Sequence, residues 1–119
     1  ATRTLMRYFG WGGFMSYEVA CDLRYTRYLR EAPDKLTWAH AGPGALRGLR
    51  RVTGRYPTAA EALELMRELH AKLEPDWPGT SGLELREVEH SLCEFDKYER
   101  VRLGEGRPRA LFKPDGGEY

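Results

Sequence analysis

The chain has 119 residues, of which 41% are hydrophobic and 31% are charged. This length allows one domain with one core and excludes two independent domains, and this composition excludes an intrinsically disordered chain. The net charge of +1 predicts no partner by itself, so the positions of the charges matter more than their sum.

Three features of the whole chain bear on its cellular compartment, its membrane association and its domain organisation. Cys21 and Cys93 are too few for a disulfide scaffold, and we expect reduced thiols in a cytoplasmic protein. No apolar run approaches the roughly 20 residues that cross a bilayer, so we expect no membrane partner. The chain begins at ATRTLM and ends in GGEY, which is compatible with a piece of a longer protein, and we treat residues 1–119 as one helical domain.

Aromatic residues, glycines and arginines follow one another closely in the first part of the chain. The FGWGG turn at 9–13 fits either a packed loop or a platform on which a base stacks. A first helix is predicted over 14–23. Arginines and aromatic residues then alternate over 24–30, a pattern that suits nucleic acid and equally a hydrated helix face.

A glycine turn between two short helices is the first feature with a binding mechanism. The first helix is predicted over 33–39, the GPG turn follows at 42–44, and the second helix runs over about 45–53. Amides at the start of the second helix lack partners, so a phosphate can approach, and arginines on this helix add positive charge. We therefore predict a helix-hairpin-helix-like turn that binds DNA. The predicted DNA-binding residues are Gly42, Pro43, Gly44, Arg47, Arg50 and Arg51.

The next helix is predicted over about 58–73, opened by a capping box of Thr58 and Glu61. We expect His70, near its apolar stripe, to be a structural histidine rather than a ligand. Its predicted buried stripe comprises Ala62, Leu65, Met66, Leu69 and Leu73.

Residues 83–103, the longest run without glycine or proline, predict the last helix, with a capping box at 81–84 before it and Gly104 ending it. Asp96 and Glu99 fall on the core-facing arc, where a carboxylate must be paired or perform chemistry. The predicted apolar stripe comprises Leu85, Val88, Leu92, Phe95 and Leu103. A polar stripe along its edge comprises Glu89, Cys93, Asp96 and Arg100.

The side chains leave several kinds of chemistry open. His90 and Cys93 are only two of the ligands that a metal needs, and we expect no metal. Cys93 could act as a nucleophile with His90 as its base. Glu89, Glu94 or Asp96 could act as acid or base, with Lys97 and Arg100 holding an anion. No P-loop, CxxC or HExxH motif occurs, and the sequence does not specify a cofactor.

No pair of strands with hairpin chemistry is visible, so we predict an all-α fold of about five helices with short connections. Residues 104–119 are predicted to form a basic C-terminal arm that includes Arg107 and Arg109.

Three uncommon stretches resemble one known family. They are FGWGGFMSYEVACDLRYT, TWAHAGPGALRGLRR and EHSLCEFDKYERVRLGEGRPR, in that order. Together they resemble the helical domain associated with 5-hydroxymethyl-deoxyuridine DNA kinases and with alpha-glutamyl/putrescinyl thymine pyrophosphorylases, which are proteins of phage and phage-like DNA base hypermodification. The resemblance covers about residues 9–109. It implies an all-helical fold similar to helix-hairpin-helix DNA glycosylases, acting on a modified thymine in DNA in a phage-infected or bacterial cell.

The resemblance also extends to single positions. No acid follows the turn at the spacing of the catalytic Asp of DNA glycosylases, so we do not expect base excision. Beyond the turn and Arg47, the matching positions are Glu89, His90, Cys93, Glu94, Asp96, Lys97, Tyr98, Arg107 and Arg109.

We favour an enzyme domain that transfers a group at a flipped, modified thymine. The alternatives are a non-catalytic helix-hairpin-helix module that binds DNA and a scaffold domain that binds an acidic protein; a partner chain or a further domain could complete the site. The predicted catalytic residues are Glu89, His90, Cys93 and Asp96. The predicted substrate- and phosphate-binding residues are Lys97, Arg100, Arg107 and Arg109.

Overall fold

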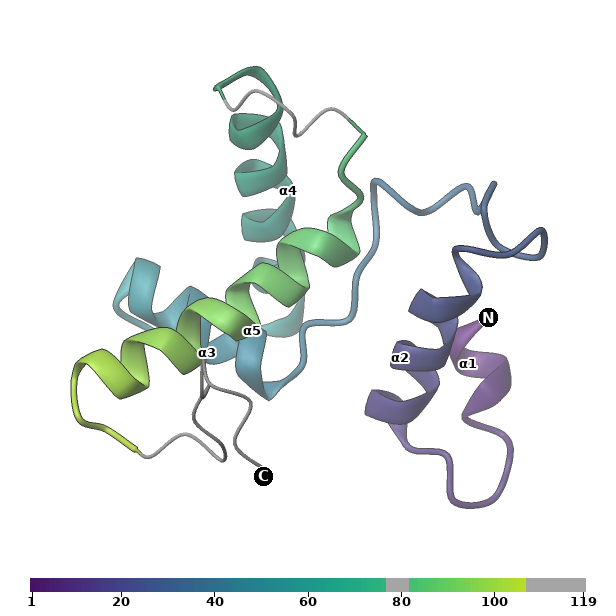
Figure 1. Ribbon diagram of the computed structural model, residues 1–119, viewed down its shortest axis with the longest axis horizontal. Helices are drawn as coiled ribbons and strands as arrows, with labels where there is room; N and C mark the ends of the chain where they lie inside the picture. The colour runs from purple at the N-terminus through teal and green to yellow at the C-terminus, as the bar shows by residue number, and fades with distance from the viewer. Residues whose placement is uncertain (77–81, 107–119) are drawn as a thin grey trace, which may run out of the picture.

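The computed structural model describes residues 1–76 and 82–106, so predictions for Ser81, Arg107 and Arg109 lie outside the described residues. The described residues form five α-helices and no strand, which confirms the predicted fold class (Figure 1). None of these helices is both long and apolar enough to cross a membrane. The helices are α1 (Thr2–Leu5), α2 (Gly13–Leu23), α3 (Pro43–Thr53), α4 (Ala59–Asp76) and α5 (Leu85–Arg102).

The centre of the fold is the contact between α3 and α5 (Figure 1). Two glycines on one face of α3 make this contact close. A Cβ at Gly48 would lie 2.4 Å from the carbonyl oxygen of Leu92, and a Cβ at Gly44 would lie 2.8 Å from the sulfur of Cys93. Both distances are shorter than van der Waals contact, so any larger residue would push the two helices apart.

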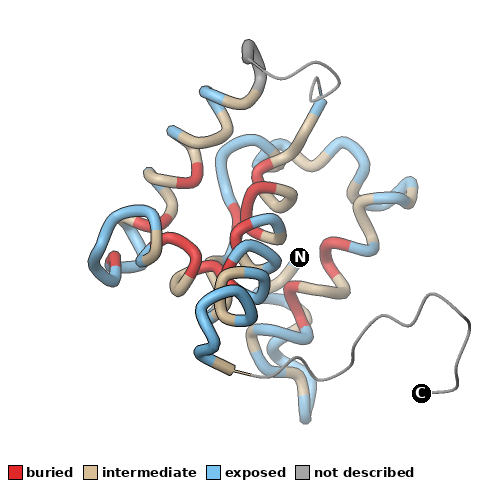
Figure 2. The backbone as a smooth tube through the Cα atoms, turned by 60° about the vertical axis from the view of Figure 1, so that its left-hand side comes forward, coloured by how far each residue is buried: buried red, intermediate tan, exposed pale blue. Residues whose placement is uncertain are grey.

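Apolar side chains from several helices extend this contact into one core. Leu49 of α3, Met66 of α4 and Leu85 of α5 are almost fully inaccessible to solvent. Tyr17 of α2 joins the same cluster. Figure 2 shows the buried residues along the inner sides of these helices, while their outer sides remain exposed.

Specific contacts confirm the capping box predicted at the start of α4 and the structural role expected of His70. The Thr58 amide donates to Glu61 Oε2 at 2.8 Å, and the Glu61 amide donates to the Thr58 hydroxyl at 3.3 Å, which confirms the capping box. A ring nitrogen of His70 lies 2.7 Å from the carbonyl oxygen of Leu83. His70 therefore serves as a structural contact between α4 and the segment before α5.

The short helix predicted over 33–39 does not form, and this segment is a run of turns. Its carbonyl groups bind distant parts of the chain instead. The Leu85 amide donates to the Lys35 carbonyl at 3.0 Å, and Arg67 Nε donates to the Thr37 carbonyl at 3.0 Å. A helix of seven residues would form few hydrogen bonds of its own, so the hydrogen bonds from Leu85 and Arg67 stabilise the turns more than helix formation would. The GPG turn therefore follows turns rather than a helix, and its likeness to a helix-hairpin-helix stays a prediction.

The caps of α5 differ in part from the predicted ones. Glu84 is the N-cap residue, and its capping-box partner is Glu87. The helix ends at Arg102, and Gly104 follows with φ 69°, as expected for a glycine that terminates a helix.

The predicted apolar stripe of α5 is buried only over its first half. Leu92 is buried, whereas Phe95 and Leu103 are exposed. The reason is that the second half of α5 turns Asp96, not Phe95, toward α3.

We expect Gly48→Ala to lower the free energy of unfolding by about 1–3 kcal/mol, because its Cβ would overlap the Leu92 carbonyl. This loss would occur although alanine favours a helix over glycine by roughly 0.5–1 kcal/mol. Urea unfolding followed by circular dichroism measures the change. The matched control is Gly13→Ala on α2, where the new Cβ would lie at an ordinary 3.6 Å from the His40 ring and should not destabilise the fold. Equal stability of the two variants would contradict the close approach.

Candidate functional site

Asp96 on α5 is completely buried. Its carboxylate accepts one hydrogen bond from Arg47 Nε at 2.7 Å and one from Arg51 Nε at 2.8 Å, both from α3. Burial alone would raise the pKa of Asp96, but the two guanidinium groups outweigh burial and hold this pKa below its ordinary value. Asp96 is therefore an anion at neutral pH, and it fixes two arginines in place.

An open hollow of about 340 Å³ lies beside this carboxylate. Within it Arg51 also pairs with Glu105, and Arg50 lies over the Tyr56 ring with 4.8 Å between guanidinium carbon and ring centroid. Within residues 1–76 and 82–106, neither Arg50 nor Arg100 forms an ion pair with a carboxylate. We call this site the arginine hollow, lined by Arg47, Arg50, Arg51, Gly54, Asp96, Arg100 and Glu105. Four arginines and two carboxylates give this lining two net positive charges.

A second carboxylate, Glu89, is buried beneath the GPG turn. Its Oε1 accepts hydrogen bonds from the Gly42 amide at 3.3 Å and from the Cys93 thiol at 3.5 Å. His90 Nε2 lies 3.6 Å from Glu89 Oε2. Burial raises the pKa of Glu89, and burial together with the charge of Glu89 raises the pKa of Cys93 to about 12. Cys93 is thus a neutral thiol at pH 7, which disfavours nucleophilic attack.

The predicted catalytic residues fall into two separate groups. Glu89, His90 and Cys93 gather beneath the glycine turn. Asp96 lies with Arg100 in the arginine hollow, about 10 Å further along α5, because seven residues separate it from Glu89. Among the described side chains, no three of the types His, Cys, Asp and Glu come close enough to hold a metal ion.

The glycine turn lies at the start of α3, and the predicted DNA-binding arginines lie in its middle and last turns. The amide of Gly42, the N-cap residue of α3, donates to Glu89 Oε1. Pro43 is the first residue of the helix, and Gly44 faces Cys93. Gly42 and Gly44 therefore both contact α5, while Arg47, Arg50 and Arg51 line the hollow further along α3, and DNA binding by the turn stays a prediction.

One predicted phosphate-binding residue lies away from the hollow. Lys97 pairs with Glu94 on the exposed side of α5. Arg107 and Arg109 fall outside the described part of the chain, so their role stays a prediction. Of the predicted phosphate-binding residues, Arg100 is the one that the structure brings to the arginine hollow.

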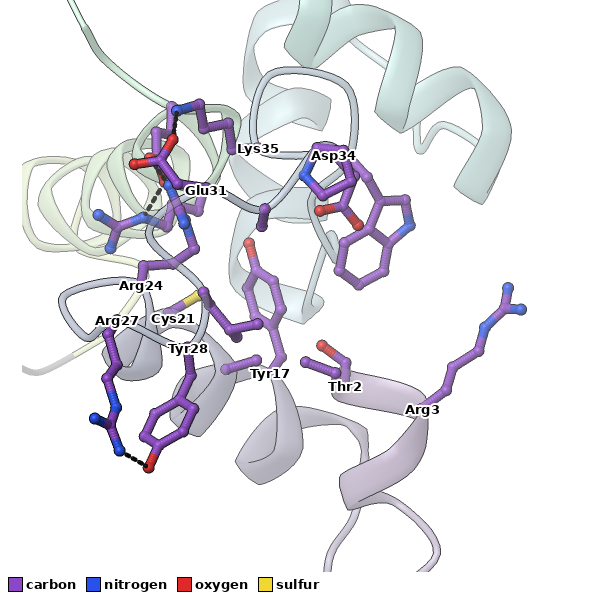
Figure 3. A pocket seen from close by; sticks show the side chains of 18 residues that line it. Thr2, Arg3, Tyr17, Cys21, Arg24, Arg27, Tyr28, Glu31, Asp34 and Lys35 are labelled. Atoms are coloured by element: carbon purple, nitrogen blue, oxygen red, sulfur yellow. Dashed lines mark hydrogen bonds and ion pairs between the residues drawn. The ribbon is translucent and has the colours of Figure 1, made fainter.

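A larger cavity of about 640 Å³ lies between residues 1–3, α2, the turns at 24–38 and the start of α5 (Figure 3). We call it the aromatic cavity because Tyr17, Tyr28 and Trp38 are among its lining residues. None of these was a predicted site residue. The alternation of arginines and aromatic residues over 24–30 is the sequence signal that pointed toward it.

One comparison with known proteins gives a match. The family model for "5-hmdU DNA kinase, helical domain" matches residues 1–107, which is 107 of the 119 residues. The matched range includes all five helices and all lining residues of both the arginine hollow and the aromatic cavity. No curated protein and no solved structure matches the chain.

We expect Asp96→Asn to lower the free energy of unfolding at neutral pH by about 2–3 kcal/mol, because two arginines lose the charge that holds them. The folded pKa of Asp96 lies below its unfolded value of 3.8, so its contribution is complete above this pH and is lost as the pH falls through the folded pKa. The difference between variant and wild type should therefore shrink below about pH 4. Urea unfolding at several pH values measures it, and a difference that stays constant into the acid range would contradict the ion pairs.

Proposed function

The chain belongs to the family of 5-hmdU DNA kinase helical domains, and we propose that it acts as a DNA-binding module in DNA base hypermodification. In this proposal the arginine hollow holds the phosphate backbone of DNA that carries the modified thymine. The role needs positive charge in a fixed place, and it needs no catalytic group from the hollow itself.

The observation that carries this proposal is the pair of arginines without a carboxylate partner among the described residues. Arg50 and Arg100 line the same hollow from α3 and from α5. Arg47 contributes as well, because it binds Asp96 through Nε and still has 41% of its side chain exposed. Guanidinium groups bind phosphate oxygens through two parallel hydrogen bonds, so a hollow of this charge favours a phosphate.

Asp96 supports binding in this proposal by holding the arginines, not by taking part in chemistry. Its carboxylate is inaccessible and both oxygens accept hydrogen bonds from α3. Because Arg47 and Arg51 are fixed through their Nε atoms before DNA arrives, they lose less side-chain freedom on binding. Preorganised arginines of this kind raise affinity without any new contact.

A second candidate function is group transfer at a flipped base, with Glu89 as the acid or base. The raised pKa of Glu89 favours this role, because burial brings its carboxyl closer to the range in which it exchanges protons near neutral pH. Asp96 suits it less well, since its pKa is lowered. His90 lies beside Glu89 and could pass a proton to it.

We expect Arg50→Gln and Arg100→Gln each to weaken the binding of duplex DNA about three- to tenfold at low salt, because each removes one phosphate contact. Each should also reduce the slope of log affinity against log salt by about one. Fluorescence anisotropy of a labelled duplex at several salt concentrations measures both quantities. The matched control is Arg30→Gln, which removes an exposed arginine outside the hollow and should change little.

Two outcomes would reject this proposal. If the wild-type chain fails to retain duplex DNA at low salt, the basic surface binds another partner, and an acidic protein becomes the better candidate. If Arg30→Gln weakens binding as much as the two variants in the hollow, the hollow is not where the backbone lies.

Glu89→Gln tests the second candidate. Glutamine keeps an acceptor for the Gly42 amide, so we expect the fold and the DNA affinity to persist. The folded pKa of Glu89 lies above its unfolded value of 4.5, so its ionisation opposes folding as the pH rises past that value. The variant should therefore be at least as stable as wild type at pH 7. Mass spectrometry of nucleosides from 5-hmdU DNA, treated with the complete modification system, would show lost modification if Glu89 is catalytic and unchanged modification if it is structural.

A further inference from the structure

The aromatic cavity is not used by the function proposed above. Its walls come from residues 1–3, the buried side of α2, the turns at 24–38 that follow α2, and the start of α5 (Figure 3). Glu84, at the start of α5, accepts a hydrogen bond from Arg24 Nε at 2.8 Å and so joins these segments. The volume of about 640 Å³ lies within the range of small-molecule binding sites.

Aromatic rings form part of the cavity wall. Tyr17 and Trp38 meet edge to face, with ring centroids 5.8 Å apart and planes at 83°, so the two rings make a corner. Tyr28 is exposed, and its hydroxyl accepts a hydrogen bond from Arg27 at 3.2 Å. Aromatic rings stack on the face of any nucleobase, so this wall suits a flat heterocycle without requiring one particular base.

Two buried polar groups of the lining residues, the Tyr17 hydroxyl and Nη1 of Arg24, have no hydrogen-bond partner within the described residues, and the arginine is the charged one. Only 10% of the Arg24 side chain is exposed, and it binds Glu84 through Nε and Nη2. Its Nη1 is buried and makes no hydrogen bond there. A buried donor without an acceptor is costly, so the cavity favours a ligand that brings an oxygen acceptor.

The charges around the cavity also favour an anionic or strongly polar ligand. Glu84 is bound by two arginines, and Glu31 lies 3.9 Å from Lys35. Arg27 forms no ion pair with a carboxylate in the part of the chain that the structure describes. The lining bases are Arg3, Arg24, Arg27, Lys35 and Arg86, and the lining acids are Glu31, Asp34 and Glu84. A cation would be repelled, and an apolar ligand would leave these donors without acceptors.

From these contacts we infer that the aromatic cavity binds one nucleotide unit. Its base lies against the aromatic wall, most of whose exposed ring surface comes from Tyr28 and Trp38, and its carbonyl or phosphate oxygens lie toward Arg24 and Arg27. Two sources share this chemistry: a nucleotide swung out of a duplex, for which the inference rests on the proposed DNA-binding function, and a free nucleotide.

The indole N–H resonances of the complete chain give a direct test by NMR. Trp38 lines the cavity and Trp11 does not, so Trp11 serves as an internal control, and Trp38→Phe assigns the signal. The probes are thymidine 5′-monophosphate, a duplex with one unpaired thymidine, and the same duplex fully paired. We expect the Trp38 resonance to shift with the mononucleotide or with the unpaired thymidine, and to stay in place with the paired duplex.

Surface variants separate the cavity from the arginine hollow. Tyr28→Ala and Arg27→Gln should each weaken binding of the responding probe about tenfold, because each removes a stacking or charged contact. Binding of the paired duplex should not change. The matched controls are Tyr98→Ala and Arg30→Gln, which alter exposed residues outside the cavity. All four positions are exposed, so each variant should fold.

The outcomes distinguish this inference from the proposed function. A Trp38 shift with the mononucleotide supports a free nucleotide as ligand, and a shift with the unpaired thymidine alone supports a nucleotide swung out of DNA. Absence of both shifts while the paired duplex still binds overturns the inference and leaves the proposed function standing. Failure of every duplex to bind, with the mononucleotide shift retained, overturns the proposed function alone. If the control variants lose as much affinity for the probe as Tyr28→Ala and Arg27→Gln do, the inference that the aromatic cavity binds a nucleotide is also overturned.

Discussion

The spacing between α3 and α5 is the constraint on which the rest of the structure depends. Gly48 lets the backbone of α3 approach the Leu92 carbonyl more closely than any side chain would allow. At this spacing Asp96 reaches the Nε atoms of Arg47 and Arg51 across the contact. The arginine hollow is thus a product of how two helices meet, and it needs no separate binding loop.

Local signals predicted those parts of the fold that local contacts decide. The glycine stop at the end of α5, the capping box of α4 and the inward position of Asp96 all follow from residues within one or two helical turns. The helix predicted over 33–39 was wrong, because Leu85 and Arg67, far along the chain, donate hydrogen bonds to the carbonyl groups of this segment. No local pattern contains that information.

For the candidate site too, the sequence predicted the local feature but not the distant partners. Periodicity placed a carboxylate inside, yet only the fold shows that its partners are two arginines previously assigned to DNA. The aromatic cavity joins residues about sixty positions apart, such as Arg24 and Glu84, so its lining could not be assembled from spacing. The family match and the two sites together describe a domain in which α5 contributes to both: its first residues border the aromatic cavity, and its second half borders the arginine hollow.

The glycine face of α3 affects how inactive variants should be interpreted. A mutational scan that scores nucleic-acid retention would flag positions 44 and 48 as strongly as the arginines, although neither glycine is among the residues that line the hollow. Such hits would report a widened gap between two helices and a collapsed arrangement of charges. A variant can lose binding because it lacks a contact to nucleic acid or because the two helices have moved apart. A measurement of folding on every such variant is therefore needed before its residue is counted as part of the interface.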